Sequence, residues 1–253
     1  MDIFVLVKQT FDTEEKITLL DHAVQEDGVK FVINPYDEYA VEQAILIREA
    51  FGGKITLLSV GPERTAEALR TALAMGADEA VLISDERIHG DEFEVAEILA
   101  SYLREQPLDL LLGGNFSVDH GAGQVAIRVA ALLNIPHVAS VTKLELIDGK
   151  AIAHRDAEGD VEIIEVPLPA MFTAQQGLNE PRYPSLPGIM KAKKKPFKHL
   201  SLDDLNVSAI VPKTIRAELA LPPERQAGRL LKGTLSEQVA ELVQALRNES
   251  KVI

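Results

Sequence analysis

The stretch from residue 113 to residue 125, GGNFSVDHGAGQV, has the composition of a phosphate-binding loop. Its glycines Gly113, Gly114, Gly121 and Gly123 allow a ligand to approach the backbone closely, and its amides lead into the start of a predicted helix. Backbone amides arranged in that way can bind a phosphate group. The same glycines would also suit a tight connection without a ligand, and both interpretations stay open on these residues alone.

Several other kinds of chemistry are excluded by what the sequence lacks. The loop has no Gly-Lys-Ser/Thr ending and no GxGxxG motif follows the first predicted strand, so neither a Walker-type ATP site nor an ordinary NAD site is indicated. The chain has no cysteine, which excludes disulfides, thiolate metal sites and thiol nucleophiles. Redox activity would therefore need a bound cofactor. We predict no catalytic residue and no metal site, and the net charge of −13 argues against nucleic acid as a partner.

A second distinctive stretch is GLNEPRYPSLPGIMKAKKK, residues 177–195, which we call the recognition loop. Its prolines, Pro181, Pro184 and Pro187, remove backbone donors, so we expect no regular element there. The loop nevertheless carries large apolar side chains, at Leu178, Tyr183, Leu186, Ile189 and Met190. A partner is expected to cover some of them, although Leu186 could instead pack against its own domain. A cationic run follows, Lys191, Lys193, Lys194, Lys195 and Lys198, and in an acidic chain it favours docking to an acidic surface.

The elements that must position these two loops alternate between strand and helix. We predict strands at 2–8, 29–33, 54–60, 80–84 and 108–113, and helices at 35–51, from the turn at 61–62 to 75, at 92–104 and at 123–133. Residues 9–28 are expected to be irregular. The alternation predicts an α/β fold with a doubly wound, mostly parallel sheet. Ligands of such sheets bind beyond the carboxyl ends of the strands, where 6–8, 34–37, 59–61 and 113–125 should lie.

After residue 136 the pattern changes to strands joined by tight turns, at 138–146, 151–155, 161–166 and 170–174, which predicts an appended antiparallel sheet. Residues 199–232 have few periodic signals, so we expect an extended arm that lies on another chain. A capping box at 234–237 then opens an amphipathic helix whose apolar stripe needs a surface to cover. The predicted domains are thus 1–198, an α/β nucleotide-binding domain that includes the recognition loop, and 199–253, an arm and helix that pack on a partner.

Three segments of the sequence, LNEPRYPSLPGIMKAKKK at 178–195, INPYDEYAVEQA at 33–44 and RTALAMGADEA at 70–80, resemble the β subunit of electron-transfer flavoproteins in that family's order. The resemblance covers most of the chain. It implies a Rossmann-like, adenine-nucleotide-hydrolase-like fold and a heterodimer in which the arm and last helix lie on the α subunit. It also implies a FAD held mainly by that α subunit. The β subunit would hold AMP or, in an electron-bifurcating subgroup, a second FAD.

The resemblance further implies the binding residues. The adenine and ribose would contact Leu6, Asn34, Pro35, Tyr36, Asp37 and Val60, and the phosphate would contact Gly113, Asp119, Gly123, Gln124 and Val125. Arg155 and Asp156 would lie near the flavin, or would form only a surface ion pair. The donor dehydrogenase would contact Tyr183, Leu186, Pro187, Ile189, Met190 and Lys191, with Leu186 inserted. Many members resemble Asp-Gly-Asp-Thr-Ala-Gln-Val where this chain has DHGAGQV at 119–125, so the identity of the nucleotide stays open.

By this resemblance the protein is an electron carrier and no catalyst by itself. It would take electrons from a dehydrogenase such as an acyl-CoA dehydrogenase, as in fatty acid oxidation, and pass them through FAD to a quinone oxidoreductase. An electron-bifurcating subunit and a universal-stress-type nucleotide-binding sensor are the alternatives. The sequence has no run of about 18 apolar residues and no start like that of a signal peptide, so we expect a location in the cytoplasm of a prokaryote.

Overall fold

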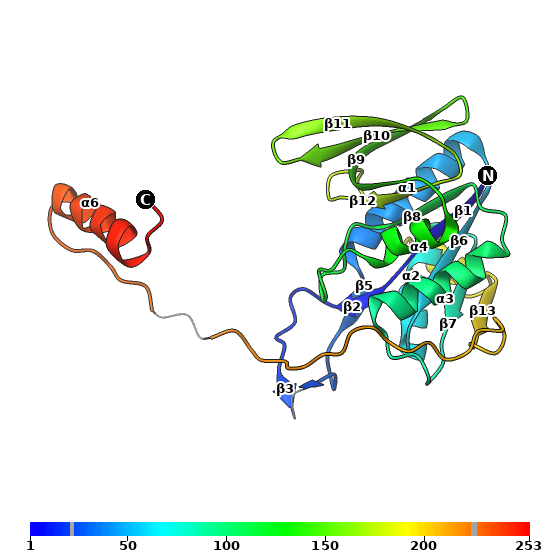
Figure 1. The fold of residues 1–253 in the computed structure, drawn as a ribbon, viewed down its shortest axis with the longest axis horizontal. Helices are drawn as coiled ribbons and strands as arrows, with labels where there is room; N and C mark the ends of the chain where they lie inside the picture. Colours follow the sequence, from blue (N-terminus) through cyan, green and yellow to red (C-terminus); the bar gives the residue numbers. More distant parts are fainter. Residues whose placement is uncertain (21–22, 224–226) are drawn as a thin grey trace.

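A nine-stranded sheet forms the centre of the computed structural model, which describes residues 1–20, 23–223 and 227–253 (Figure 1). In sheet order the strands are β11 (Asp160–Pro167), β10 (Lys150–Ala157), β9 (His137–Ile147), β12 (Ala170–Ala174), β8 (Leu110–Gly114), β1 (Asp2–Leu6), β6 (Lys54–Val60), β7 (Glu79–Ile83) and β13 (Phe197–Leu200). The strands from β9 through β12 to β13 pair in parallel. The predicted mostly parallel α/β fold is therefore confirmed.

Helices cover both faces of this sheet. The first core contains buried residues of α1 (Pro35–Phe51) and α2 (Ala66–Met75), and the second contains those of α3 (Glu92–Arg104) and α4 (Val125–Leu133). The apolar run of β1 shows why: Ile3 and Val5 belong to the first core, whereas Phe4 and Leu6 belong to the second. Successive side chains of a strand point to opposite faces, so a strand buried on both faces must be apolar throughout.

The antiparallel part differs in detail from the prediction. Strands β9, β10 and β11 are antiparallel to one another, but they continue the main sheet because β9 pairs with β12. The prediction was wrong for β12, which runs parallel to both β8 and β9. Residues 9–28, expected to be irregular, contain β2 (Gln9–Phe11), β3 (Leu19–Leu20) and β4 (Ala23–Val24). Of these, β2 pairs with β5 (Phe31–Ile33), and β3 pairs with β4.

The recognition loop contains a short helix that the sequence did not predict. Helix α5 (Leu186–Ala192) has Pro187 in its first turn, and the Ser185 hydroxyl accepts a hydrogen bond from the Gly188 amide at 3.1 Å. Proline breaks a helix interior but suits its first turn, because the amide that it lacks would have no partner there. The expectation of no regular element was therefore wrong for these seven residues.

The chain then returns to the body before it leaves as an arm. Strand β13 adds to the edge of the sheet beside β7, and Leu202 is fully buried. The Asp91 carboxylate accepts hydrogen bonds from the amides of Lys213 and Thr214, so the body holds the chain up to this point, well beyond residue 199. Residues 224–226 of the predicted arm lie outside the described residues.

The last helix, α6 (Leu235–Gln244), opens with the predicted capping box of Thr234 and Glu237 and continues into a π-helical turn, η2 (Ala245–Glu249). It stands apart from the sheet in Figure 1 and buries none of its residues against the described part of the chain. Its apolar stripe is exposed at Leu235, Val239, Leu242 and Val243. Across residues 1–20, 23–223 and 227–253, no helix has the length and apolar character needed to cross a bilayer.

Candidate functional site

A cavity of about 280 Å³ lies at the carboxyl ends of β1, β6 and β8. Its apolar wall includes Leu6, Leu58, Val60, Val95 and Leu99, and its polar wall includes Lys8, Asn34, Ser117 and residues 122–124. Of the predicted nucleotide-binding residues, the lining includes Leu6, Asn34, Asp37, Val60, Gly113, Gly123, Gln124 and Val125. Pro35, Tyr36 and Asp119 are not part of the lining.

Asp37 connects two of the strand ends that line this cavity. Its side chain is buried and accepts hydrogen bonds from the Lys8 amide at 2.6 Å and from the Gly114 amide at 3.0 Å. Burial raises the pKa of the Asp37 carboxyl to about 7, although the two amides and the Lys8 charge act in the opposite direction. A Cβ on Gly114 would overlap with Asp37, so glycine is needed at this position for the close approach. Asp37 therefore joins the ends of β1 and β8.

Asn34 and Tyr36 support the glycine-rich loop. The Asn34 side-chain amide donates to the Phe116 carbonyl at 3.0 Å, and its oxygen accepts from the Val118 amide at 3.2 Å. Asn34 stands at the N-cap position of α1, but its side chain makes no capping hydrogen bond. The Tyr36 ring packs on the Phe116 ring with centroids 4.2 Å apart, and Phe116 lines the cavity. Tyr36 thus acts on the cavity through the loop, whereas Asn34 both supports the loop and lines the cavity.

The end of the loop leads into α4 as the sequence predicted, although the helix begins at Val125 and not at Gly123. Gly123 has a φ of 61°, and a Cβ there would lie 3.0 Å from the Asn115 carbonyl oxygen. Only glycine adopts this conformation without strain. The residues from Ala122 to Ala126 line the cavity, so the N-terminus of α4 lies at the cavity. This is the arrangement in which a helix N-terminus can bind an anion.

Lys8 is the cationic side chain at the polar wall. The sequence pattern predicts residues 6–8 at the ligand-binding edge but does not identify Lys8 as a binding residue. Its ammonium group lies 2.8 Å from the Asp119 carboxylate and 3.2 Å from the Ser117 hydroxyl. Burial would raise the pKa of Asp119, but the hydrogen bonds from Lys8 and Ser117 hold it below its usual value. The signal in the sequence was a lysine directly after a buried strand, at the edge where ligands bind.

The base of the arm is attached to the body on two sides of the cavity. On one side, Asp91 lies between the lining residues Gly90 and Glu92; it caps α3 by accepting from the Glu94 amide and also holds the arm at residues 213–214. On the other side, the Arg216 guanidinium donates to Nε2 of His120 at 3.1 Å. An arginine can only donate, so this nitrogen of His120 is the acceptor. The arm and the glycine-rich loop are therefore connected directly.

Arg155 and Asp156 lie away from the cavity, on β10. Arg155 pairs with Glu162 of β11 at 2.7 Å across the two strands, and Asp156 is its neighbour in sequence. An exposed pair of this kind contributes little to stability. The proximity of these two residues to a flavin stays a prediction.

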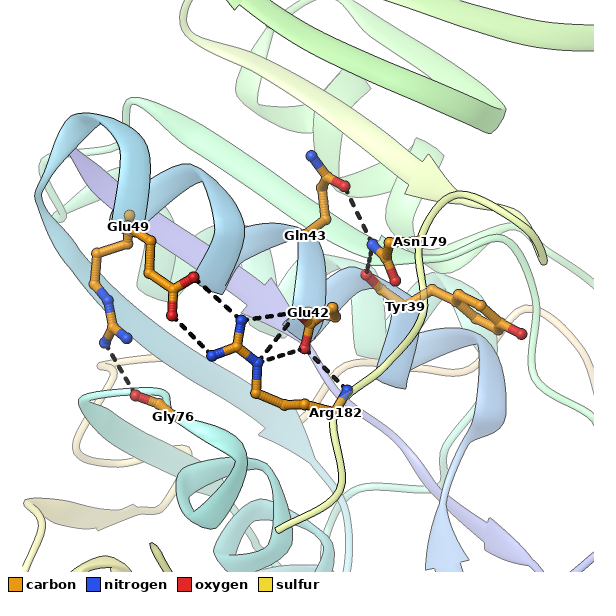
Figure 2. A network of polar contacts seen from close by, with 8 residues as sticks. Tyr39, Glu42, Gln43, Glu49, Gly76, Asn179 and Arg182 are labelled. Atoms are coloured by element: carbon orange, nitrogen blue, oxygen red, sulfur yellow. Dashed lines mark hydrogen bonds and ion pairs between the residues drawn. The ribbon is translucent and has the colours of Figure 1, made fainter. Parts of the chain in front are cut away.

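The recognition loop presents most of its apolar side chains to solvent, whereas Leu178 packs against the first core (Figure 2 shows the attachment of the loop to α1). Tyr183 is 94% exposed, Leu186 81% and Met190 67%, so the alternative that Leu186 packs on its own domain was wrong. The lysines differ from one another. Lys195 donates to the carbonyls of Leu73 and Ala77 at the end of α2, and burial lowers its pKa, whereas Lys191, Lys193 and Lys194 are exposed. Lys195 therefore holds the loop in place.

Comparison with known proteins gives consistent matches. A family model described as the electron transfer flavoprotein domain matches residues 21–205. The chain is 54% identical to the electron transfer flavoprotein subunit beta of Bacillus subtilis, over 100% of both chains. It is 40% identical to the subunit beta of Syntrophomonas wolfei, over 100% of this chain and 98% of the relative. It is also 34% identical to the caffeyl-CoA reductase-Etf complex subunit CarD of Acetobacterium woodii, over 100% of both.

Proposed function

This chain belongs to the electron transfer flavoprotein family as a β subunit, and from that premise we propose that it carries electrons from a dehydrogenase, such as an acyl-CoA dehydrogenase, to a quinone oxidoreductase. Membership implies an α subunit as partner and a flavin in the assembly. It also removes the reason to consider a universal-stress-type sensor. The observation that supports the proposal most is the recognition loop, whose large apolar side chains are exposed on a well-anchored base.

We propose that the cavity holds AMP, while the FAD lies mainly on the α subunit. The apolar wall at Leu6, Leu58 and Val60 suits an adenine, and the amides at 122–126 together with Lys8 suit a phosphate. The volume of about 280 Å³ is just below the range for small-molecule pockets, about 300–1,000 Å³, and so favours a mononucleotide over a dinucleotide. The flavin would supply the redox chemistry. This chain would contribute binding and docking surfaces, and its cytoplasmic location stays a prediction.

A second FAD in place of AMP is the second candidate. The Acetobacterium woodii relative is named as a subunit of a caffeyl-CoA reductase-Etf complex, and so as part of an assembly with a reductase. For this chain we therefore retain an electron-bifurcating subunit as the alternative. The residues at 119–125 are compatible with this alternative. The acidic and hydroxyl side chains at the third and fourth positions of the motif Asp-Gly-Asp-Thr-Ala-Gln-Val are replaced here by Gly121 and Ala122.

The cofactor content of the purified heterodimer tests both candidates. The chain is expressed with its α subunit, the complex is denatured, and the released flavins and nucleotides are separated and counted per dimer. We expect one FAD and one AMP. Two flavins and no AMP would mean that the chain is an electron-bifurcating subunit and not a simple carrier. A colourless chain that purifies without an α subunit would contradict the proposed function altogether.

The exposed lysines of the recognition loop are expected to affect the association rate with the dehydrogenase. Changing Lys191, Lys193 and Lys194 together to glutamate should lower that rate about tenfold at low salt, with a much smaller change in dissociation, because charges at the rim steer encounter. Stopped-flow mixing at several salt concentrations measures the effect. The matched control reverses Lys30, Lys143 and Lys150, which form ion pairs elsewhere on the surface. An equal loss in both triple variants would show an effect of net charge alone.

A further inference from the structure

Arg182 connects the recognition loop to α1 through two carboxylates (Figure 2). Its guanidinium donates to Glu42 from Nε, at 3.1 and 2.9 Å, and from Nη2, at 2.9 Å. It also donates to Glu49 from Nη1, at 2.8 Å, and from Nη2, at 3.2 Å. The Arg182 backbone amide donates to Glu42 as well, at 3.1 Å. All three guanidinium nitrogens and the amide thus bind two side chains that are two helical turns apart on one face of α1.

The contact with Glu42 is strongly constrained, because the Glu42 side chain is only 5% exposed. A buried carboxylate needs a cation and hydrogen bonds, so release of Arg182 from α1 would leave a charge out of water without a partner. Glu49 is half exposed, and its hydrogen bond with Arg182 lowers its pKa. Three residues before Arg182, the Asn179 side chain donates to the Tyr39 carbonyl and to Gln43. This end of the loop is therefore held along α1.

The other end of the loop is held by α2. Arg70 donates to the Ala192 carbonyl at 2.8 Å, and Lys195 donates to two carbonyls at the end of the same helix. Gly188 lies so close to the Ala74 carbonyl that a Cβ would overlap with it. Between these attachments lie the exposed side chains of Tyr183, Leu186 and Met190. The segment that a partner would touch is short and is fixed on both sides.

We propose that Arg182 is a positioning residue for docking, which holds α5 and Leu186 in their docking conformation before the electron-donating dehydrogenase arrives. This inference rests on the proposed function, in which that dehydrogenase binds the recognition loop. Arg182 is adjacent to the exposed Tyr183, yet its own polar atoms bind carboxylates of α1. A preformed surface loses less conformational entropy on binding than a mobile one, so it binds more tightly with the same contacts.

The test compares variants of the heterodimer by two measurements. The first is hydrogen exchange of the amides of α5, and the second is steady-state reduction by the dehydrogenase as the heterodimer concentration is varied. Arg182→Ala is expected to speed α5 exchange and to raise KM for the heterodimer about tenfold with kcat within about twofold. Arg182→Lys, which cannot bind both carboxylates in parallel, should have an intermediate effect. Glu49→Gln, which removes only the exposed half of the contact, keeps the test possible should Arg182→Ala not fold.

Arg87→Ala is the matched control, because Arg87 also bridges two carboxylates, Asp85 and Asp203, away from the loop. It should leave α5 exchange and KM unchanged. Unchanged α5 exchange in Arg182→Ala and Glu49→Gln would overturn the inference. Faster exchange without a rise in KM would also overturn it. In that case Leu186→Ala shows whether only the positioning role of Arg182 fails or the proposed docking site fails as well. A raised KM for Leu186→Ala keeps the proposed docking site, whereas a normal KM for both variants rejects it.

Discussion

Leu186→Ala is expected to lower kcat/KM for reduction by the donor dehydrogenase about 30-fold, because truncation of a central apolar anchor at an interface costs about 2 kcal/mol or more. The Leu186 side chain is 81% exposed at the start of α5 and contributes nothing to either core of its own domain. Its loss should therefore leave folding, flavin content and nucleotide content unchanged. Steady-state reduction of the heterodimer by the dehydrogenase measures the effect.

The control for this prediction is Ile163→Ala on β11. Ile163 is also apolar and largely exposed, but it lies on a strand at the opposite edge of the sheet from β13. We expect no change in kcat/KM for that variant. An unchanged kcat/KM for Leu186→Ala would mean that the donor binds elsewhere, and an equal loss in both variants would point to a general effect of surface hydrophobicity.

The parts of the fold that could be predicted from the sequence are those in which neighbouring residues decide the outcome. Every residue from Ile3 to Val7 is apolar, and a strand buried on both faces follows from that run alone. The capping box of α6 is likewise a local pattern of four residues. The position of the cavity could be predicted with one further step of reasoning. Parallel strands place their carboxyl ends at one edge of the sheet, and the glycine-rich loop comes directly after one of these strands.

The parts that could not be predicted depend on partners distant in sequence. Asp37 was expected only as a nucleotide contact, yet its carboxylate binds amides 29 and 77 residues away. Lys195 looked like one more docking lysine until the end of α2 supplied two carbonyls for it. Strand β13 carries Lys198 and His199 and has no strand signal of its own, but β7 leaves an edge with free backbone groups that β13 satisfies. Local patterns cannot reveal such pairings.

Asp37→Asn is expected to weaken AMP binding at least about tenfold and to lower the free energy of unfolding by about 1–3 kcal/mol, because it leaves a buried amide without an acceptor. The carboxylate accepts from the amides of Lys8 and Gly114 with one oxygen each. Asparagine has one oxygen, so its amino group would face one of these two donors. The ends of β1 and β8, which line the cavity, would then separate. Calorimetric titration with AMP and chemical unfolding measure the two effects.

The loss of unfolding free energy in Asp37→Asn should depend on pH, which gives an independent check on the role of Asp37. Burial raises the pKa of its carboxyl from 3.8 to about 7, so the native state holds a proton that the unfolded chain has released. The contribution to stability is full below the unfolded pKa and is lost as the pH rises through about 7. The destabilisation by Asp37→Asn should therefore be larger at about pH 5 than at about pH 8, measured by unfolding at each pH.

Asp12→Asn is the control for this pH dependence. The Lys30 hydrogen bond lowers the pKa of the exposed Asp12, so the contribution of Asp12 to stability stays constant over that pH range. A destabilisation by Asp37→Asn that does not change with pH would show that Asp37 is already ionised at pH 5 and that hydrogen bonding outweighs burial at this site.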